Sequence, residues 1–331
     1  MMSRSGGRAS LRKSSVNGSE PGPIASRYLR LGTLLLILGS FLFVGPASPG
    51  RAAKILFKSK FDGSLLLGTP YDCGTSCWQD IEGSDPATGD SWAPQIWGGD
   101  GKLQLLADTP VTPDTVNSYV FGDIQRVMGP RGEQTAVLYS EIRKRGGGAT
   151  QAPFLIAPST TAAQGDLYVS YWIKLQPDLL ERLGSKSWRV LFEWKTNAQD
   201  RLITYIYTDA LNRPYWDLKA DDLSGRVIRT FWEVANHTAP VPVGEWFKFE
   251  FFWHRSSQRD GRVWQAINGQ VVFDHFGPLL GGNDPIDRIM LTQVYAGGTV
   301  PLYQWVDDIE IWDGFPCGDG APCGTKMTAP R

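Results

Sequence analysis

Between residues 188 and 312 the sequence repeats one pattern, a short aromatic-rich stretch of alternating apolar and polar residues that ends in a turn. Alternation with a period of two places every second side chain on the same face of a β-strand. Strands at this spacing, separated by Gly, Asn, Asp and Pro, are typical of antiparallel sandwiches and jelly rolls. Strands are expected over residues 188–197, 201–209, 244–255, 262–275, 287–296 and 302–312. A functional site in such a fold lies on an exposed sheet face or in the loops at its rim.

The amino-terminal half carries weaker strand signals and one helical segment. Further strands are expected over residues 53–64, 101–108, 135–146 and 166–176, and the rest of 65–113 is expected to be irregular. Residues 177–184 have a helical pattern, because Pro177 begins the segment, Gly184 ends it and three leucines share one side. Asp260-Gly261 and Asn268-Gly269 predict hairpin turns. The fold is therefore predicted to be all-β, an antiparallel jelly-roll β-sandwich with one short rim helix.

The first 53 residues differ from the rest of the chain. They hold seven basic residues and one acid, followed by an almost unbroken apolar run from 31 to 44 and then small residues. This order predicts a polar lead and an export signal cleaved near Ala47 or Ala53. An uncleaved membrane anchor is the alternative, although this run of ~14 residues is short for a span that needs ~20. Residues 54–331 are then a single jelly-roll domain that is secreted, periplasmic or displayed at the cell surface.

The charge and aromatic content of this domain restrict its partners. Removing the basic residues and the acid of the first 53 positions from totals of 33 and 34 leaves 26 basic and 33 acidic residues. A net charge of −7 argues against nucleic acid, because phosphate binding relies on clustered cations. All 13 tryptophans lie in this part, so some are expected to line a binding surface. We expect a monomer, with membrane contact only through an uncleaved amino-terminal segment.

The four cysteines form two local pairs, Cys73/Cys77 and Cys317/Cys323. In an exported chain such pairs indicate disulfides. Spacing favours two local bridges, but three connectivities are open to four cysteines. A zinc site is the alternative, which is disfavoured because neither pair has the CxxC spacing.

Three stretches carry a family resemblance: GEWFKFEFFWH at 244–254, AINGQVVFD at 266–274 and QWVDDIEIWDG at 304–314. Together they resemble the concanavalin A-like jelly-roll superfamily, which includes lectins, laminin-G-like domains, glycoside hydrolases and polysaccharide lyases. The resemblance extends from Lys54 to Phe315 and is greatest to the polysaccharide lyases of the alginate, glucuronan and heparin type. It is specific for the fold and says little about activity.

Alginate lyases of this fold carry an Arg-x-Glu-x-Arg strand, a Gln-x-His strand and a late strand with a catalytic Tyr. The stretch YSEIR at 139–143 resembles the first of these, with Tyr139 in place of the first Arg. The stretch IMLTQVYA at 289–296 resembles the third, which implies that Tyr295 is the catalytic Tyr. Residues 193–195 (EWK) occupy the place of Gln-x-His and depart from the family pattern.

The alternation independently groups polar residues on these strands. Arg189, Arg201 and the candidates below are expected to share an exposed sheet face. Such a face suits β-elimination on a uronic acid polymer, in which a cation neutralises the carboxylate and side chains move two protons. The candidate catalytic residues are Arg143 as the neutraliser, Lys195 assisting it, and Tyr295, Tyr207 or His254 as proton carriers. The candidate substrate-binding residues are Tyr139, Glu141, Glu193, Tyr205 and Gln293.

Several alternatives remain open at this point. The charged residues could form a cross-strand ion-pair array that only solvates the sheet. The chain could then be a non-catalytic carbohydrate-binding or adhesion domain, or a structural envelope protein. No His or carboxylate spacing indicates a catalytic metal, and no cofactor is expected for catalysis. Asp62 and Asp308 could supply oxygen ligands to a structural Ca²⁺, because first and last strands are neighbours in jelly rolls; ordinary strand-end turns are the alternative.

Overall fold

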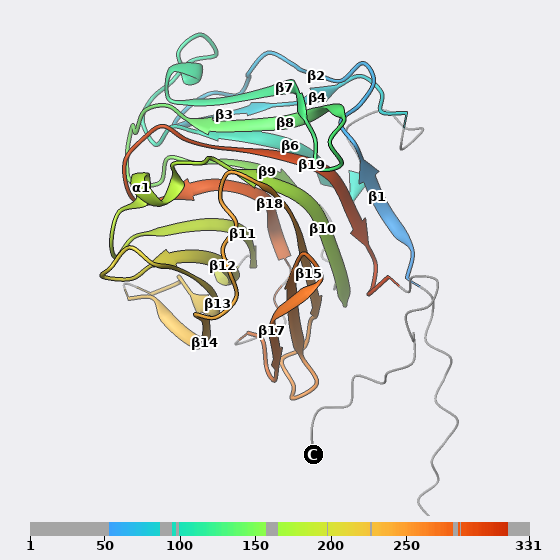
Figure 1. Cartoon of the computed structure of the whole chain (residues 1–331), viewed down its shortest axis with the longest axis vertical. Coiled ribbons are helices and arrows are strands. Elements are labelled where there is room, and N and C mark those ends of the chain that lie inside the picture. The colour runs from blue at the N-terminus through green and yellow to red at the C-terminus, as the bar shows by residue number, and fades with distance from the viewer. Residues whose placement is uncertain are drawn as a thin grey trace, which may run out of the picture. The chain divides into compact units, whose positions relative to one another are not determined.

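The computed structural model describes residues 53–86, 95–96, 99–156, 165–196, 198–225, 227–280, 284 and 286–316. These residues belong to one compact unit, residues 51–331. It is an antiparallel β-sandwich with one short α-helix, which confirms the predicted fold class (Figure 1). The predicted export signal and the pair Cys317/Cys323 lie outside the described residues.

One layer of the sandwich is an eight-stranded sheet. Its strands, in spatial order, are β17 (Gln270–Phe276), β16 (Arg262–Ile267), β15 (Trp246–His254), β10 (Asp166–Leu175), β19 (Leu302–Trp312), β8 (Gln134–Ile142) and β7 (Val120–Met128). Strand β1 (Ile55–Ser59) pairs with β19. The first and last long strands of the domain are therefore neighbours, as predicted.

The other layer is a nine-stranded sheet. Its strands, in spatial order, are β14 (Arg229–Asn236), β13 (Pro214–Asp222), β12 (Asp200–Thr208), β11 (Trp188–Thr196), β18 (Ile286–Ala296), β9 (Ala152–Ile156), β6 (Gly99–Leu106) and β3 (Ser76–Gln79), with β5 (Gln95–Ile96) paired to β6. Figure 1 shows β11–β14 on one side of the domain and β15 and β17 on the other. A small third sheet pairs β2 (Leu66–Leu67) with β4 (Ile81–Glu82).

The core lies between the two large sheets and is rich in aromatic side chains. Strand β15 turns Phe247, Phe249, Phe251 and Trp253 inward, and all four are fully buried, which follows the period of two. From the facing sheet, Phe192 of β11 packs 4.5 Å from the Phe251 ring. Burying one Phe side chain contributes roughly 1.5–3 kcal/mol, so this strand alone anchors a large part of the core.

The predicted rim helix and hairpin turn are both present. Helix α1 (Leu179–Leu183) buries two of its leucines and ends at Gly184, where φ is 68°. Asn268 and Gly269, with φ of 51° and 75°, form the tight turn between β16 and β17. Positive φ at both central residues is what a two-residue hairpin of this kind requires.

Eight strands in the described part of the chain were not predicted from the sequence: β2, β3, β4 and β5, which lie in the stretch expected to be irregular, and β7, β9, β13 and β14. Pro153 lies within β9 and Pro214 begins β13. A proline lowers the strand signal of a short segment because it cannot donate a ladder hydrogen bond. Strand β14 is the last strand of its sheet and stays largely exposed, so its apolar pattern is weak.

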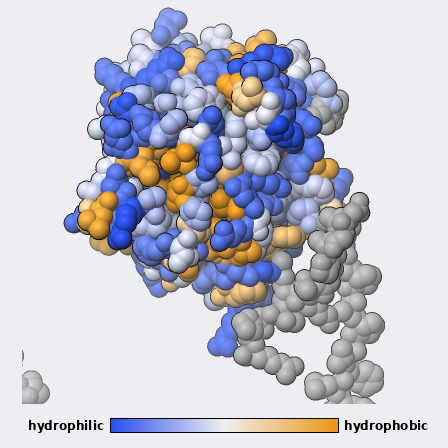
Figure 2. Space-filling view, in the orientation of Figure 1, coloured by the Kyte–Doolittle hydropathy of each residue, from blue (hydrophilic) through white to orange (hydrophobic). Residues whose placement is uncertain are grey.

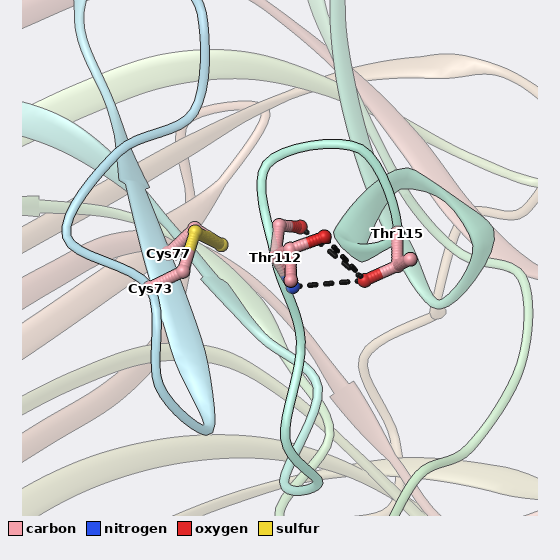
Figure 3. Close-up of a disulfide and its surroundings, with 4 residues drawn as sticks. All are labelled: Cys73, Cys77, Thr112 and Thr115. Carbon is pink, nitrogen blue, oxygen red and sulfur yellow. Dashed lines mark hydrogen bonds between the residues drawn. A yellow bond between two sulfur atoms is a disulfide. The ribbon is translucent and has the colours of Figure 1, made fainter.

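The predicted disulfide between Cys73 and Cys77 is present and lies at the start of β3 (Figure 3). The nearby turn before the 3₁₀ helix η1 (Val116–Ser118) is held by Thr115, whose Oγ1 accepts a hydrogen bond of 2.8 Å from the Thr112 backbone nitrogen. The disulfide thus closes a loop next to the terminal strand of the nine-stranded sheet.

The two sheets also meet along one edge, where β14 and β17 come together. The Asn236 amide donates a 2.9 Å hydrogen bond to the Val272 carbonyl, and the Trp232 ring stacks 3.9 Å from His275.

Figure 2 shows hydrophobic residues across the middle of this view, with hydrophilic residues above them. None of the helices in the described part of the chain is long and apolar enough to cross a membrane.

Candidate functional site

The outer face of the nine-stranded sheet carries a continuous row of aromatic rings, which we call the ring row. Neighbouring ring centres along it are 4.2, 5.8, 4.9, 6.2 and 4.7 Å apart. In order, its members are His237, Tyr215, Tyr207, Tyr205, Trp188 and Tyr295. They come from β18, β11, β12, β13 and the residue after β14, and four strand spacings of ~4.8 Å give the row a length of ~19 Å.

Strand register explains why these rings line up. Trp188 pairs with Tyr207, and Tyr207 pairs with Tyr215 on the next strand. Val190 pairs with both Tyr205 and Tyr295, and its side chain packs beneath the rings in a small apolar cluster with Ile203. Rings on directly opposed positions of adjacent strands are in contact range, so the register itself creates the row.

A buried charge cluster lies beside the ring row. The Arg201 guanidinium bonds both carboxylate oxygens of Asp221, Nε at 2.5 Å and Nη2 at 2.9 Å. Glu193 Oε1 lies 3.6 Å from Arg201 Nη1 and 3.1 Å from Lys195 Nζ. The side chains of Glu193 and Asp221 are 2% and 0% exposed. The cations are therefore held in fixed positions by acids that have almost no contact with water.

Electrostatics in this cluster keeps the ionic form of Arg201. Burial by itself lowers the pKa of Arg201, but the hydrogen bonds to Asp221 and the neighbouring Tyr205, Glu193 and Asp221 raise it above its ordinary value. Burial raises the pKa of Asp217 on β13 to about 7, with help from the Glu233 carboxylate.

Tyr295 and Tyr207 have different surroundings along the ring row. Burial, followed by the Glu193 charge, raises the pKa of Tyr295, so its phenol holds its proton firmly. Burial also raises the pKa of Tyr207, but Lys219 Nζ donates to the Tyr207 hydroxyl at 3.2 Å and counteracts the shift. Tyr295 therefore carries the proton that an acid must supply, whereas the Lys219 ammonium stabilises the phenolate that Tyr207 would need in order to accept one.

Arg145 was not predicted as a site residue. It lies in the loop after β8, and its guanidinium reaches the end of β18, the strand that carries Tyr295. Its Nη2 donates to the backbone carbonyls of Ala296 at 2.7 Å and Gly297 at 3.0 Å. Burial lowers the pKa of Arg145, and the nearby Tyr295 opposes this shift. The glycine-rich sequence after Arg145 reads as a plain connection, so no local signal identifies this contact.

Six of the ten candidate residues lie on this outer face: Lys195, Tyr295, Tyr207, Glu193, Tyr205 and Gln293. Gln293 is fully buried there and donates to the Gln151 side chain. Lys219, Asp221, Trp188 and Tyr215 complete the face and were not among the candidates. Lys219 and Tyr215 lie on the unpredicted strand β13, which is why the sequence did not place them.

The expectation that all candidates share one face is wrong for the other four. Tyr139, Glu141 and Arg143 belong to β8 and the residue after it, and His254 belongs to β15, both in the eight-stranded sheet. The stretches YSEIR and IMLTQVYA therefore lie in different sheets. Alternation fixes which residues of one strand share a face, but it does not say to which sheet the strand belongs.

Arg189 was expected beside Glu193 but points into the core instead. Strand β11 shifts register between Val190 and Phe192, which inverts the alternation on its amino-terminal side. Arg189 is fully buried, and its Nη2 donates to Gln304 Oε1 at 2.7 Å. Burial lowers the pKa of Arg189 to about 9.

On the eight-stranded sheet the displaced candidates have their own partners. Arg143 Nε bonds Glu141 at 2.8 Å, and its guanidinium lies 3.7 Å from the Phe121 ring centre. His254 Nδ1 lies 2.6 Å from Asp166 Oδ1, and this hydrogen bond raises the pKa of His254. His254 also lines a cavity of about 250 Å³ in this sheet. These side chains cannot act together with Tyr295 on one bond.

No group of three or more His, Cys, Asp or Glu side chains in the described residues could hold a metal ion. The Asp62 carboxylate lies 3.3 Å from Thr135 Oγ1, and Asp308 forms an ion pair with Arg131. Both acids act electrostatically on Asp307. A structural Ca²⁺ bound through Asp62 and Asp308 stays a prediction.

No family model matches the sequence, and no curated protein does. Among solved structures, alginate lyase Aly36B, a mutant of which was solved with alginate trisaccharide, is 14% identical over 57% of this chain and 83% of that chain, with a TM-score of 0.39. Endo-β-1,4-glucuronan lyase from the fungus Trichoderma reesei is 13% identical over 58% of this chain and 89% of that one, at 0.41. The binding domain of botulinum neurotoxin DC is 10% identical over 68% and 46%, at 0.39. These likenesses concern the jelly-roll fold alone.

Proposed function

We propose that the outer face of the nine-stranded sheet binds a uronic acid polysaccharide and cleaves it by β-elimination. The observation that carries the proposal is the ring row beside the cations Lys195, Arg201 and Lys219. Aromatic rings offer flat apolar surfaces with polar tips, which suit the faces and hydroxyls of sugar rings. A row of ~19 Å, from four strand spacings, offers contacts to several sugar units of a polymer.

The cations supply the electrostatic part of the reaction. Arg201 is held by Asp221 with two hydrogen bonds, whereas Lys195 has one acidic contact, Glu193. A uronate carboxylate can therefore compete for Lys195 more easily than for Arg201. Neutralising that carboxylate makes the proton on the adjacent ring carbon acidic enough to remove. We assign Lys195 the role of neutraliser and Arg201 that of a fixed positive charge behind it.

The proton transfers fall to tyrosines. A base takes the proton from the carbon next to the carboxylate, the electron pair forms a double bond, and the glycosidic oxygen leaves with a proton from an acid. Tyr295 is the proposed acid because its phenol stays protonated. Tyr207 is the proposed base and acts as the phenolate, which the Lys219 ammonium stabilises from within hydrogen-bond distance of its oxygen; on taking the proton it becomes a neutral phenol. Arg143 and His254 have no part in this reaction.

The experiment is an absorbance assay on purified protein. Elimination produces an unsaturated sugar that absorbs ultraviolet light, so absorbance should rise on incubation with alginate, glucuronan or glycosaminoglycans. A neutral polymer such as cellulose lacks the activating carboxylate and should give no rise. Silence on all the acidic polymers would exclude lyase activity.

A second candidate function is carbohydrate binding without cleavage. It is favoured by the pairing of the cations with buried acids, because Glu193 and Asp221 already neutralise much of their charge. Such a face would bind glycans through its rings and turn over nothing. Retardation of the protein in gels that contain an acidic polysaccharide, together with silence in the absorbance assay, would establish this function.

We also propose that the protein is exported. The basic and then apolar amino-terminal sequence and the Cys73–Cys77 disulfide support this location. Expression with the full amino-terminal segment, followed by fractionation and sequencing of the mature amino terminus, tests it. A full-length protein confined to the cytoplasm would contradict it.

A further inference from the structure

The outer face of the eight-stranded sheet contains a positively charged pocket, which we call the basic pocket. Its volume is about 170 Å³. Four cationic and two acidic side chains line it, together with one tryptophan and one serine: Lys58, Lys60, Arg131, Lys248, Asp308, Glu310, Trp172 and Ser170. This excess of positive charge stands on a domain whose overall charge is negative.

Four strands and one turn meet to form the basic pocket. Lys58 of β1 pairs with Glu310 of β19, Ser170 of β10 pairs with the same Glu310, and Trp172 of β10 pairs with Lys248 of β15. Strand β19 has an extra residue opposite β10 between Ser170 and Trp172. Bulges redirect side chains at such positions. Here Asp308, with φ of 49°, reaches Arg131 at the turn between β7 and β8.

The four cations of the basic pocket differ in their acidic partners. Lys58 Nζ lies 2.6 Å from Glu310, Arg131 pairs with Asp308, and Lys248 Nζ lies 3.4 Å from Glu250. Glu250 also accepts a 2.7 Å hydrogen bond from the Tyr168 hydroxyl, so it is shared. Among the described residues, the Lys60 ammonium makes no ion pair. Lys60 and Lys248 are therefore the cations most available to an anionic ligand.

The geometry points to a site for one carboxylate-bearing sugar residue, and we propose that the basic pocket binds the same class of acidic polysaccharide as the ring row. This inference rests on the proposed function for the identity of the polymer. Trp172 provides a flat surface for the sugar ring, while Lys60 and Lys248 bind its carboxylate. A volume of about 170 Å³ is roughly ten times the ~10–15 Å³ that one water requires, which leaves room for one sugar unit.

Neighbouring side chains extend this surface along the sheet. Lys174, which follows Trp172 on the same face of β10, lies 5.7 Å from the Trp305 ring centre. Trp305 in turn contacts Tyr303 at 5.2 Å and Tyr139 at 5.7 Å between ring centres. A polymer held in the basic pocket therefore has further rings to contact on this face. The ring row lies on the other sheet, so the two surfaces bind separate stretches of polymer or separate chains.

The test uses isothermal titration calorimetry on the full chain carrying Tyr295→Phe, so that the ligand is not cleaved. The ligand is a short glucuronate oligosaccharide, with heparin and a neutral cello-oligosaccharide as comparisons. The variant is Lys60→Ser with Lys248→Ser, and the control is Lys144→Ser, an exposed lysine over the Tyr119 ring that belongs neither to the basic pocket nor to the ring row. A separate Trp172→Ala variant tests stacking, and thermal unfolding confirms that each variant is folded.

We expect the parent to bind two oligosaccharides per chain, and the double lysine variant to lose one of them or bind it about tenfold more weakly. Lys144→Ser should behave as the parent. Unchanged stoichiometry and affinity in the double variant would overturn the inference, as would equal binding of the neutral oligosaccharide. Preference for heparin over glucuronate would overturn the assignment of a carboxylate. A parent that binds one oligosaccharide, which the double variant loses, would contradict the ring-row proposal while supporting this one.

Discussion

The two outer faces of this sandwich carry the same types of charged residue but differ in how deeply they bury them. On the nine-stranded sheet, the side chains of Arg201 and Asp221 are 10% and 0% exposed and form a bidentate ion pair. On the eight-stranded sheet, Arg131 and Lys58 are 54% and 37% exposed. Buried pairs have fixed geometry and a high cost of disruption, whereas exposed pairs exchange readily with water or a ligand. The nine-stranded sheet therefore holds its charged side chains in fixed positions, whereas the eight-stranded sheet leaves cationic side chains accessible to an anionic ligand.

Their aromatic residues differ in arrangement as well. The ring row crosses four strands and ends at the residue after a fifth, because directly opposed positions repeat an aromatic from strand to strand. On the eight-stranded sheet, Tyr139, Tyr303 and Trp305 gather around one another as a patch. A line of rings offers a path for a polymer, and a patch offers a local contact. This contrast supports placing catalysis on the nine-stranded sheet.

The largest expected effect sharpens that placement. Tyr295→Phe removes one hydroxyl, keeps the ring contact with Trp188 and should lower turnover of the acidic polymer by ~10²–10⁴, the usual scale for a proton-transfer group. Affinity should change little. Tyr303→Phe, on the other sheet, is the matched control and should retain full turnover. Equal loss in both variants, or none in Tyr295→Phe, would separate the reaction from the ring row.

The fold was largely predictable because alternation is a local property. Strand β15 shows it best, since its four buried aromatics alternate with Trp246, Lys248, Glu250 and His254 apart from one position, Phe252. Strands that contain proline or have a weak apolar pattern, such as β9 and β14, were not predicted because they lack a clear local alternation. Their place in the sheet depends on partners distant in sequence, which a local pattern does not contain.

The site was predictable only in part. Alternation and resemblance together selected Tyr295, Lys195, Glu193 and Tyr205, which the fold brings onto one face. Arg143 was selected by the same reasoning and lies on the other sheet. Sheet membership and the register shift near Val190 are long-range properties, so no spacing in the sequence reveals them.

The second prediction compares two matched Arg–Asp pairs. Arg201→Ala leaves Asp221 buried without a cation and Glu193 with Lys195 as its remaining cation, and it should cost ~3–5 kcal/mol of unfolding free energy. Arg262 on the other sheet also bonds both oxygens of its partner, Asp274, at 2.7 and 2.8 Å, but that carboxylate side chain is 36% exposed. Arg262→Ala should therefore cost ~1 kcal/mol or less.

Urea unfolding of both variants at neutral pH measures the difference. Similar losses of stability would mean that burial does not distinguish the two faces energetically. A larger loss in Arg262→Ala would reverse the comparison. Retention of the wild-type slope against urea shows that the unfolding transitions are comparable.

The third prediction concerns Asp307, a buried carboxyl of the eight-stranded sheet. Burial, followed by the Asp308 charge, raises the pKa of Asp307 from 3.8 to about 7. Because the folded state holds this proton more tightly than the unfolded chain does, the stabilisation is complete below pH ~4 and is lost as the pH rises through about 7. Asp307→Asn keeps an acceptor for the Asp308 backbone nitrogen, now 2.8 Å away. The variant should exceed wild-type stability at pH 8 by up to ~4 kcal/mol.

Thermal or urea unfolding from pH 4 to 8 measures this effect. The wild-type protein should lose stability relative to Asp307→Asn as the pH increases, and the two should converge near pH 4. Asp217→Asn is the counterpart on the nine-stranded sheet, because burial raises the pKa of Asp217 to about 7 as well. A pH-independent difference between wild type and Asp307→Asn would show that the carboxyl is ionised throughout.

The smallest expected effect concerns Arg143, which the sequence predicted to neutralise the uronate carboxylate. In the structure Arg143 bonds Glu141 on the surface of the eight-stranded sheet, with its side chain 39% exposed and its guanidinium over Phe121. An exposed pair of this kind contributes ~0–1 kcal/mol to stability. Because Arg143 lies on the sheet opposite the ring row and its ion pair is weak, Arg143→Ala should change turnover by less than about twofold. Kinetics on the acidic polymer, beside Lys195→Ala as the variant expected to lose activity, measures this. A large loss in Arg143→Ala with wild-type activity in Lys195→Ala would move the reaction to the eight-stranded sheet and invert the comparison between the faces.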